Sequence, residues 1–207
     1  RQTKFAFSNT YMENPEILVI MEETPSVKGE LILDQTCIVN KEMIHELQLK
    51  GFGELEKEKL ILHSFESLYL LYADKLILYE KKKQIHFDDL LSISQKNDPE
   101  TLTKFLIYRD LKTRGYVVKD GFGFGSDFRV YERGQFGEKG AKFLIFGLNE
   151  GQQEKMGNLQ KKIEQITQMG KEPIIAVIER RGEVIYYKIN KMNFYENKSG
   201  LEELSQL

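Results

Sequence analysis

The chain has 207 residues, of which 41% are hydrophobic and 30% charged, and its formal net charge is −2. These values are ordinary for a globular protein in water, and the length suits one large domain or two small ones. We expect no membrane partner, because no apolar run approaches the ~20 residues that cross a bilayer; a slightly acidic chain is also a poor candidate for coating nucleic acid by bulk electrostatics.

The first half of the chain alternates short strand patterns with amphipathic helical patterns. The expected strands are Glu16–Met21, Leu76–Tyr79, and a hairpin of Glu30–Leu33 and Thr36–Val39 that turns around Asp34 and Gln35. The expected helices are Lys41–Lys50, a second helix for which Ser64 is the N-cap, and Phe87–Ser94. The single cysteine, Cys37, lies in an apolar stretch, so we expect it to be buried. One cysteine excludes an internal disulfide and fits a reducing cytoplasm.

The clearest helix signal comes just before Gly115. Asp98 is able to cap free amides, Pro99 suits a first helical turn, and Gly115 follows the basic residues Lys112 and Arg114. From Gly115 onward the pattern changes to short strands, so we expect a subdomain boundary there. The strands expected after it are Tyr116–Lys119, Asp127–Glu132, Lys142–Phe146, Ile174–Ile178 and Val184–Ile189. Between the third and the fourth, an amphipathic helix is expected with Met156, Leu159, Ile163, Ile166 and Met169 on one side.

Four segments, by their order and spacing, carry a resemblance to a known family. They are SFESLYLLYADKL (Ser64–Leu76), DPETLTKFLIYRDLKTRGYVVKDG (Asp98–Gly121), FGSDFRVYERG (Phe124–Gly134) and PIIAVIERRGEVIYYKI (Pro173–Ile189). Together they resemble the archaeal tRNA-intron (splicing) endonucleases over roughly Val27 to Tyr195. The resemblance implies an α/β (α+β) fold: a small mixed α/β subdomain at residues 27–114 and, at residues 115–195, a C-terminal endonuclease-like domain with a mixed sheet and flanking helices. Residues 1–26 are then an N-terminal extension and residues 196–207 a tail.

The resemblance also implies a reaction that needs no metal and no cofactor. The 2′-hydroxyl of the RNA attacks the adjacent phosphorus and leaves a 2′,3′-cyclic phosphate and a 5′-hydroxyl. Such a reaction uses a base for the 2′ proton, a cation for the charged phosphorane and an acid for the departing 5′ oxygen. The family assigns these tasks to a tyrosine, a lysine and a histidine. By motif, Tyr131 matches the tyrosine and Lys171 the lysine.

The histidine of the family has no counterpart in this chain. Aligning the strand at Phe143–Ile145 puts its position at Gly140, whereas counting from Tyr131 puts it at Ala141. Neither side chain can transfer a proton. The three histidines of the chain, His45, His63 and His86, all lie in the first half. Since positioned acid–base catalysis typically supplies ~10²–10⁴-fold in rate, we expect little cleavage by this chain alone.

The resemblance implies a four-unit assembly in which only some subunits cut. We therefore hypothesise a structural subunit of a heterotetramer, which binds precursor tRNA at a bulge-helix-bulge together with a catalytic endonuclease subunit in the cytoplasm. The candidate RNA-binding residues are Arg129 and Arg133. The candidate subunit-interface residues lie in the last strand and the turn before it: Glu179, Glu183, Tyr186, Tyr187 and Ile189.

Two other hypotheses remain open from the sequence. One is an active endonuclease in which Tyr131 and Lys171 suffice or another residue replaces the histidine; this includes a chain whose histidine was deliberately substituted, for which Ala141 is the natural position. The other is an RNA- or protein-binding scaffold that keeps the fold and has left splicing.

Overall fold

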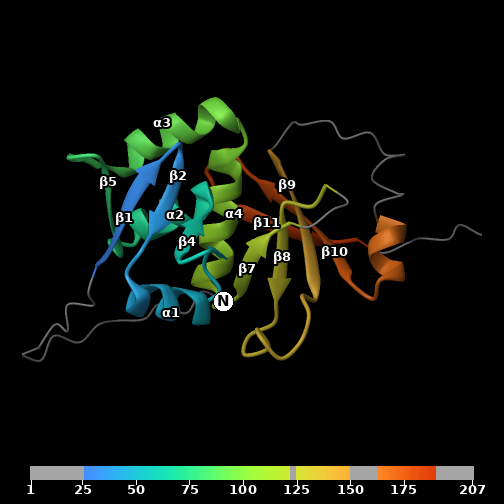
Figure 1. The fold of residues 1–207 in the computed structure, drawn as a ribbon. Helices are drawn as coiled ribbons and strands as arrows, with labels where there is room; N and C mark the ends of the chain where they lie inside the picture. Colours follow the sequence, from blue (N-terminus) through green and yellow to red (C-terminus); the bar gives the residue numbers. More distant parts are fainter. Residues whose placement is uncertain (1–25, 122–124, 150–162, 190–207) are drawn as a thin grey trace, which may run out of the picture.

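Two β-sheets flank a central helix in the structure, a computed structural model that describes residues 26–121, 125–149 and 163–189 (Figure 1). The predicted α/β (α+β) class is confirmed, with a small mixed subdomain followed by a second sheet and its helices. The expected strand at Glu16–Met21 lies outside the described residues, as do Met156 and Leu159 of the expected amphipathic helix.

The N-terminal sheet has the strand order β3-β4-β2-β1-β5-β6. Its strands are β1 (Val27–Ile32), β2 (Gln35–Ile38), β3 (Glu54–Glu56), β4 (Lys59–Leu62), β5 (Leu76–Glu80) and β6 (Lys83–Ile85). β1 and β5 are parallel, and the other neighbours are antiparallel. The helices of this subdomain are α1 (Lys41–Leu49), α2 (Ser64–Tyr72) and α3 (Phe87–Asn97). The hairpin β3–β4 was not predicted, because β3 is only three residues long and exposed throughout, so it has no apolar alternation to detect.

Two local predictions in this subdomain need correction. The β1–β2 hairpin turns at Leu33 and Asp34, whose φ angles are 49° and 63°, and not at Asp34 and Gln35, because Gln35 already pairs with Ile32 in β2. The N-cap of α2 is His63, and Ser64 is the first helical residue. The His63 amide donates to the Glu66 carboxylate at 2.9 Å, so the acidic residue of the first turn defines this helix start. Cys37 is buried, as predicted.

α4 (Thr101–Thr113) starts two residues later than predicted: its N-cap is Glu100, which makes no side-chain cap, and Pro99 lies before the helix. Its end is as expected, because Gly115 directly follows the C-cap Arg114. The Asp98 carboxylate accepts the Glu100 amide at 3.0 Å, which satisfies a donor just ahead of the helix. At the other end Gly115 has a φ of 83°, and its amide donates to the Lys112 carbonyl at 2.9 Å. This left-handed residue turns the chain out of the helix and into the second sheet.

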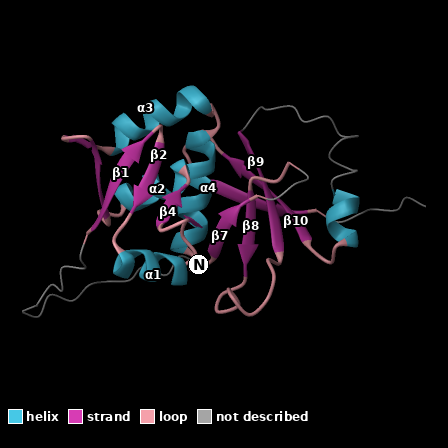
Figure 2. Cartoon of the chain, in the orientation of Figure 1, coloured by secondary structure: helices cyan, strands magenta, loops and turns pink. Residues whose placement is uncertain are grey.

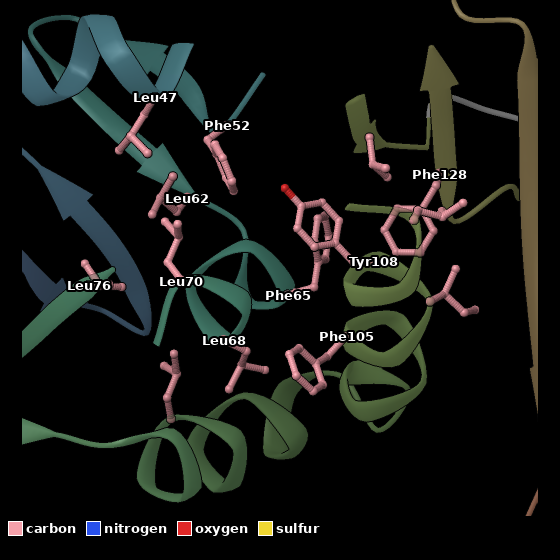
Figure 3. Packing of buried hydrophobic residues seen from close by; sticks show 14 of the residues in the cluster. Leu47, Phe52, Leu62, Phe65, Leu68, Leu70, Leu76, Phe105, Tyr108 and Phe128 are labelled. Carbon is pink, nitrogen blue, oxygen red and sulfur yellow. The ribbon is translucent and has the colours of Figure 1, made fainter. Parts of the chain in front are cut away.

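α4 links the two halves through a shared core. Its Tyr108 is fully buried and packs in one group with Phe65 of α2 and Phe128 of the second sheet (Figure 3). The rings of Phe65 and Phe128 are 5.1 Å apart and nearly perpendicular. The same apolar cluster contains residues from both sheets. The expected boundary at Gly115 therefore marks the start of the second sheet, while the core continues across it.

The C-terminal sheet has the order β11-β10-β9-β8-β7. Figure 2 labels four of these strands, β7, β8, β9 and β10. Its strands are β7 (Val117–Asp120), β8 (Phe128–Tyr131), β9 (Phe143–Asn149), β10 (Glu172–Ile178) and β11 (Val184–Lys188), so all five expected strands are present. β9 and β10 are parallel and the other pairs antiparallel. One face packs on α4. On the other, Leu144 and Phe146 pack on Ile166, within the helical residues 163–168.

Candidate active site

Tyr131, the Gly140–Ala141 segment and Lys171 lie at the same end of three neighbouring strands. Tyr131 is the last residue of β8, and Lys171 directly precedes β10. Backbone hydrogen bonds connect the three strands at this end. The Lys142 amide donates to the Val130 carbonyl, and the Glu172 amide donates to the Lys142 carbonyl, both at 2.9 Å. Adjacent strands are about 4.8 Å apart, so the backbones of β8 and β10 are separated by about 10 Å here.

Lys171 lies next to the position that lacks a histidine. Its ammonium donates to the Ala141 carbonyl. A Cβ atom built on Gly140 would lie 3.2 Å from Lys171 Nζ, a close contact that the flexible end of the lysine can relieve. Gly140 is exposed, whereas Ala141 is only 7% exposed. Of the two sequence alternatives, Gly140 is therefore the one at which a side chain would start beside Lys171 and still reach a substrate.

The Tyr131 ring is half-buried and rests against Phe136, in the loop between β8 and β9. The two ring centroids are 5.0 Å apart and the planes are nearly perpendicular. The other side of Phe136 approaches Gly51 of the N-terminal subdomain, where an added Cβ would lie 3.5 Å from the Phe136 ring and 2.3 Å from Val117 Cγ1. The tyrosine is thus supported by both halves of the protein. From the sequence, Gly51 is expected only to end the helix at Lys41–Lys50, because no local pattern reveals its contact with the distant Phe136.

The two candidate RNA-binding arginines flank Tyr131. Along β8, Phe128 and Val130 point into the core, so Arg129 and Tyr131 share the opposite face. Arg129 Nε donates to the Asp120 carbonyl at 2.9 Å, which holds its side chain along β7. Arg133 is exposed, and its guanidinium lies 5.2 Å from the centre of the Tyr116 ring. The Arg129 hydrogen bond lies toward the Phe128 end of β8, away from Tyr131, and the contact of both arginines with RNA stays a prediction.

The charged residues around this end of the sheet are arranged in ion pairs. Lys142 contacts Glu132 at 2.5 Å and Glu172 at 4.0 Å, and Lys188 contacts Glu172 at 2.8 Å. The hydrogen bond from Lys188 lowers the pKa of Glu172. A carboxyl group with a lowered pKa is ionised at neutral pH, so Glu172 is a poor substitute for the missing acid.

The three histidines lie in the N-terminal subdomain. His45 is exposed on α1, His63 is stacked on Phe65 with ring centroids 5.2 Å apart, and His86 is the exposed N-cap of α3. None belongs to the strands or loops that carry Tyr131 and Lys171. The fold therefore does not bring a histidine from elsewhere in the chain into the position left by Gly140.

β11 is the edge strand nearest the chain's end among the described residues. Ile185 and Tyr187 point outward, with 36% and 52% of their surface exposed. Tyr186 points inward, and its hydroxyl donates to Asp110 of α4 at 2.8 Å; burial and this hydrogen bond raise its pKa. The Ile189 amide donates to the Pro173 carbonyl at 3.2 Å. The outward face of β11 is thus open to a partner, whereas Tyr186 contacts its own chain.

The turn between β10 and β11 is a tight hairpin. The Glu179 amide donates to the Glu183 carbonyl at 3.0 Å, and Gly182 takes a φ of 78°. Glu183 is exposed together with Arg180 and Arg181, and Glu179 is half-buried. The turn therefore presents mixed charge at its tip, and its docking into a partner stays a prediction.

Neither a metal centre nor a membrane helix is found in the part of the chain that the structure describes. No three or more His, Cys, Asp or Glu side chains are grouped so as to hold a metal ion there. The described helices are also too short or too polar to span a bilayer.

A two-part α/β protein with a tyrosine and a lysine at one end of its second sheet matches one family over most of its length. The family model described as tRNA intron endonuclease, catalytic C-terminal domain, matches residues 101–186, and the model of the N-terminal domain of the same family matches residues 27–91. The chain therefore belongs to the tRNA intron endonuclease family, and the resemblance noted from the sequence is confirmed.

Curated relatives from archaea agree with this assignment. The tRNA-splicing endonuclease of Methanococcus vannielii is 32% identical over 79% of this chain and 93% of that protein. The tRNA-splicing endonuclease of Pyrococcus horikoshii is 31% identical over 70% of this chain and 84% of that protein. That of Pyrococcus furiosus is 29% identical over 78% of this chain and 94% of that protein.

Proposed function

We propose that this chain is a structural subunit of a tRNA-splicing endonuclease. It helps a catalytic partner subunit to bind the bulge-helix-bulge of precursor tRNA in the cytoplasm, as part of a heterotetramer, so that the intron is removed. The observation that carries the proposal is the glycine beside Lys171: a Cβ at Gly140 would lie 3.2 Å from the lysine ammonium, yet no proton donor is there.

The remaining residues are suited to holding a phosphate and less suited to completing a cleavage. The Lys171 ammonium offers a positive charge to a phosphate oxygen, and the Tyr131 hydroxyl is able to hydrogen-bond a 2′-hydroxyl. At Gly140 and Ala141, however, neither side chain is an acid that protonates the departing 5′ oxygen. Loss of one positioned acid typically lowers the rate by ~10²–10⁴-fold, so the site favours RNA binding over turnover.

The outward face of β11 supports an assembly with a second subunit. Ile185 and Tyr187 leave an apolar surface on an edge strand, and such strands are common sites of pairing between chains. The formal net charge of −2 also favours a partner, because a basic surface for RNA must then come largely from another subunit.

The test is a cleavage assay on an intron-containing precursor tRNA, with the chain alone and with a histidine-bearing relative from the same source. We expect cleavage only in the mixture, with 2′,3′-cyclic phosphate and 5′-hydroxyl ends. Brisk cleavage by the chain alone would instead identify an active endonuclease. Absence of both cleavage and co-purification in the mixture would favour a scaffold outside splicing.

Restoring the proton donor provides the matched test of the site. Gly140→His puts an imidazole beside Lys171, so we expect the single chain to gain cleavage by about 10²-fold or more. Ala141→His is the control, because the Ala141 side chain is buried and does not present a ring to RNA. Equal rates for the two variants, or no gain for Gly140→His in a folded protein, would contradict the assignment of this end of the sheet.

A further inference from the structure

A second positively charged site lies in the N-terminal subdomain, in a hollow between α1, α2 and the end of α4. The hollow has a volume of about 240 Å³. We call it the lysine hollow, because Lys50, Lys75 and Lys112 line it with one acidic residue, Glu46. Pockets for drug-sized ligands are usually ~300–1,000 Å³, so this hollow suits a small group.

The wall of the hollow is rigid and largely apolar. Leu47, Phe52 and Leu70 form part of it; each is at least 95% buried in the core, and they converge from three different segments (Figure 3). Tyr69 adds a hydroxyl-bearing ring that is stacked on Phe52, with centroids 6.2 Å apart. The charged groups are therefore held around a fixed surface, as in a pre-formed site.

Lys112 is the most constrained of the three lysines. Its Nζ donates to the Lys50 carbonyl at 3.1 Å and lies 4.2 Å from the centre of the Phe52 ring. Burial lowers its pKa to about 8; Glu66 opposes this fall, while Lys119, Lys50 and Lys75 add to it.

The hollow has more positive charge than its carboxylates neutralise. Glu46 is paired with Lys50 on α1. Among the described residues, no ion pair joins Lys75 or Lys112 to a carboxylate. Glu66, the buried acid that acts on Lys112, accepts the amides of Gly53 and His63 at 3.0 and 2.9 Å. An anion in the hollow would supply the missing negative charge.

We propose that the lysine hollow binds a phosphate group through Lys75 and Lys112. The Lys75 ammonium and the Lys112 donors not used by the Lys50 carbonyl match the oxygens of a phosphate, and Tyr69 lines the same hollow. The apolar wall beside the half-buried Lys112 strengthens the attraction between the charges there. Within the described ranges neither ammonium is in an ion pair, so the phosphate displaces no carboxylate there.

The source of the phosphate is the RNA backbone, a step that rests on the proposed function. The loop that carries Phe52 also carries Gly51, which packs beside Phe136, and Phe136 contacts the Tyr131 ring. A chain of contacts through Gly51 and Phe136 thus links the loop beside the lysine hollow to Tyr131. RNA held at Tyr131 and Lys171 has a second anchoring point on the N-terminal subdomain.

The first experiment tests phosphate binding without RNA or cleavage. The full chain, labelled on lysine side chains, is titrated with inorganic phosphate while the pKa of Lys112 is followed by NMR. We expect phosphate to raise this pKa, since an anion stabilises the ammonium, and Lys75→Gln to weaken phosphate binding several-fold. Lys82→Gln, an exposed change of the same charge in the turn after β5, is the control. An unchanged Lys112 pKa at saturating phosphate, or equal effects of the two variants, would overturn the proposal.

The second experiment identifies the source of the phosphate. Binding of precursor tRNA to the complex of this chain with its catalytic relative is measured at several salt concentrations. Lys75→Gln is expected to weaken binding and to reduce the salt slope by about one, as loss of one phosphate contact does, whereas Lys82→Gln leaves both unchanged. If free phosphate binds but the RNA does not respond to Lys75→Gln, the backbone source is wrong. If phosphate binds and the complex cleaves no RNA, the proposed function fails while the hollow stands.

Discussion

Substitution of Gly51 by alanine tests how firmly the N-terminal subdomain supports the candidate site. Gly51 has a φ of 77°, in the left-handed region, and an added Cβ would lie 2.3 Å from Val117 Cγ1. Real Cβ atoms do not approach another atom so closely, so the Val117 side chain, β7 or the loop after α1 must shift. Because Phe136 lies beside the same position and contacts Tyr131, the shift would reach the candidate tyrosine.

Two physical effects set the size of this change. An L-residue in the left-handed region costs roughly 1–2 kcal/mol. Overpacking at a close-packed contact costs about 1–3 kcal/mol more, so Gly51→Ala should lower the free energy of unfolding by roughly 2–5 kcal/mol. Gly134 separates the two effects: its φ is 72°, but an added Cβ would meet no atom within 4 Å. Gly134→Ala should therefore lose only the backbone contribution of roughly 1–2 kcal/mol.

Urea denaturation of the two variants and the unchanged chain provides the measurement. If the dependence of the unfolding free energy on urea concentration is the same for all three proteins, the shifts in the urea midpoint report the two losses of stability. We expect Gly51→Ala to be less stable than Gly134→Ala by roughly 1–3 kcal/mol. If the two variants have the same midpoint, the close contact between the subdomains does not exist and the support of Tyr131 from this side must be abandoned.

Three further predictions concern single groups of the structure. Tyr186→Phe removes the hydrogen bond to Asp110 and should lower the free energy of unfolding by about 1 kcal/mol. Tyr187→Phe, on the exposed face of β11, is the control and should change it by less than about 0.5 kcal/mol. Equal losses for the two variants would show that the hydrogen bond is absent. Tyr108→Phe should be neutral or stabilising by thermal denaturation, because the buried Tyr108 hydroxyl has no hydrogen-bond partner among the described residues; a loss above about 1 kcal/mol would contradict this. Lys112 has a pKa of about 8 when folded, below its ordinary value of 10.5, so the unfolded chain binds more protons between these values. The stability of the unchanged chain relative to Lys112→Met should therefore rise from pH 8 to 10, and a flat difference would refute the burial of this ammonium.

Local sequence patterns were enough to predict much of the fold. Gly115 at the end of α4 and the five strands after it depend on neighbouring residues and on short hydrophobic repeats, and all are present in the structure. The start of α4 was placed two residues early: Asp98 accepts the Glu100 amide, but Glu100 is the N-cap. The motif around Tyr131 likewise pointed to the family from order and spacing. The start of α2 was placed one residue late, because Glu66 accepts amides from His63 and from the distant Gly53.

The sequence by itself determined the family, the order of most elements and the absence of a histidine from the motif at Gly140 and Ala141. Only the tertiary structure decided that Gly140, and not Ala141, lies open beside Lys171, and that Gly51 and Phe136 support Tyr131. It also brought Lys75 and Lys112 together around the lysine hollow. The physical reason is that helix caps and hydrophobic repeats depend on residues a few positions apart in the chain. A site depends instead on strand register and on packing between segments that are far apart in the chain.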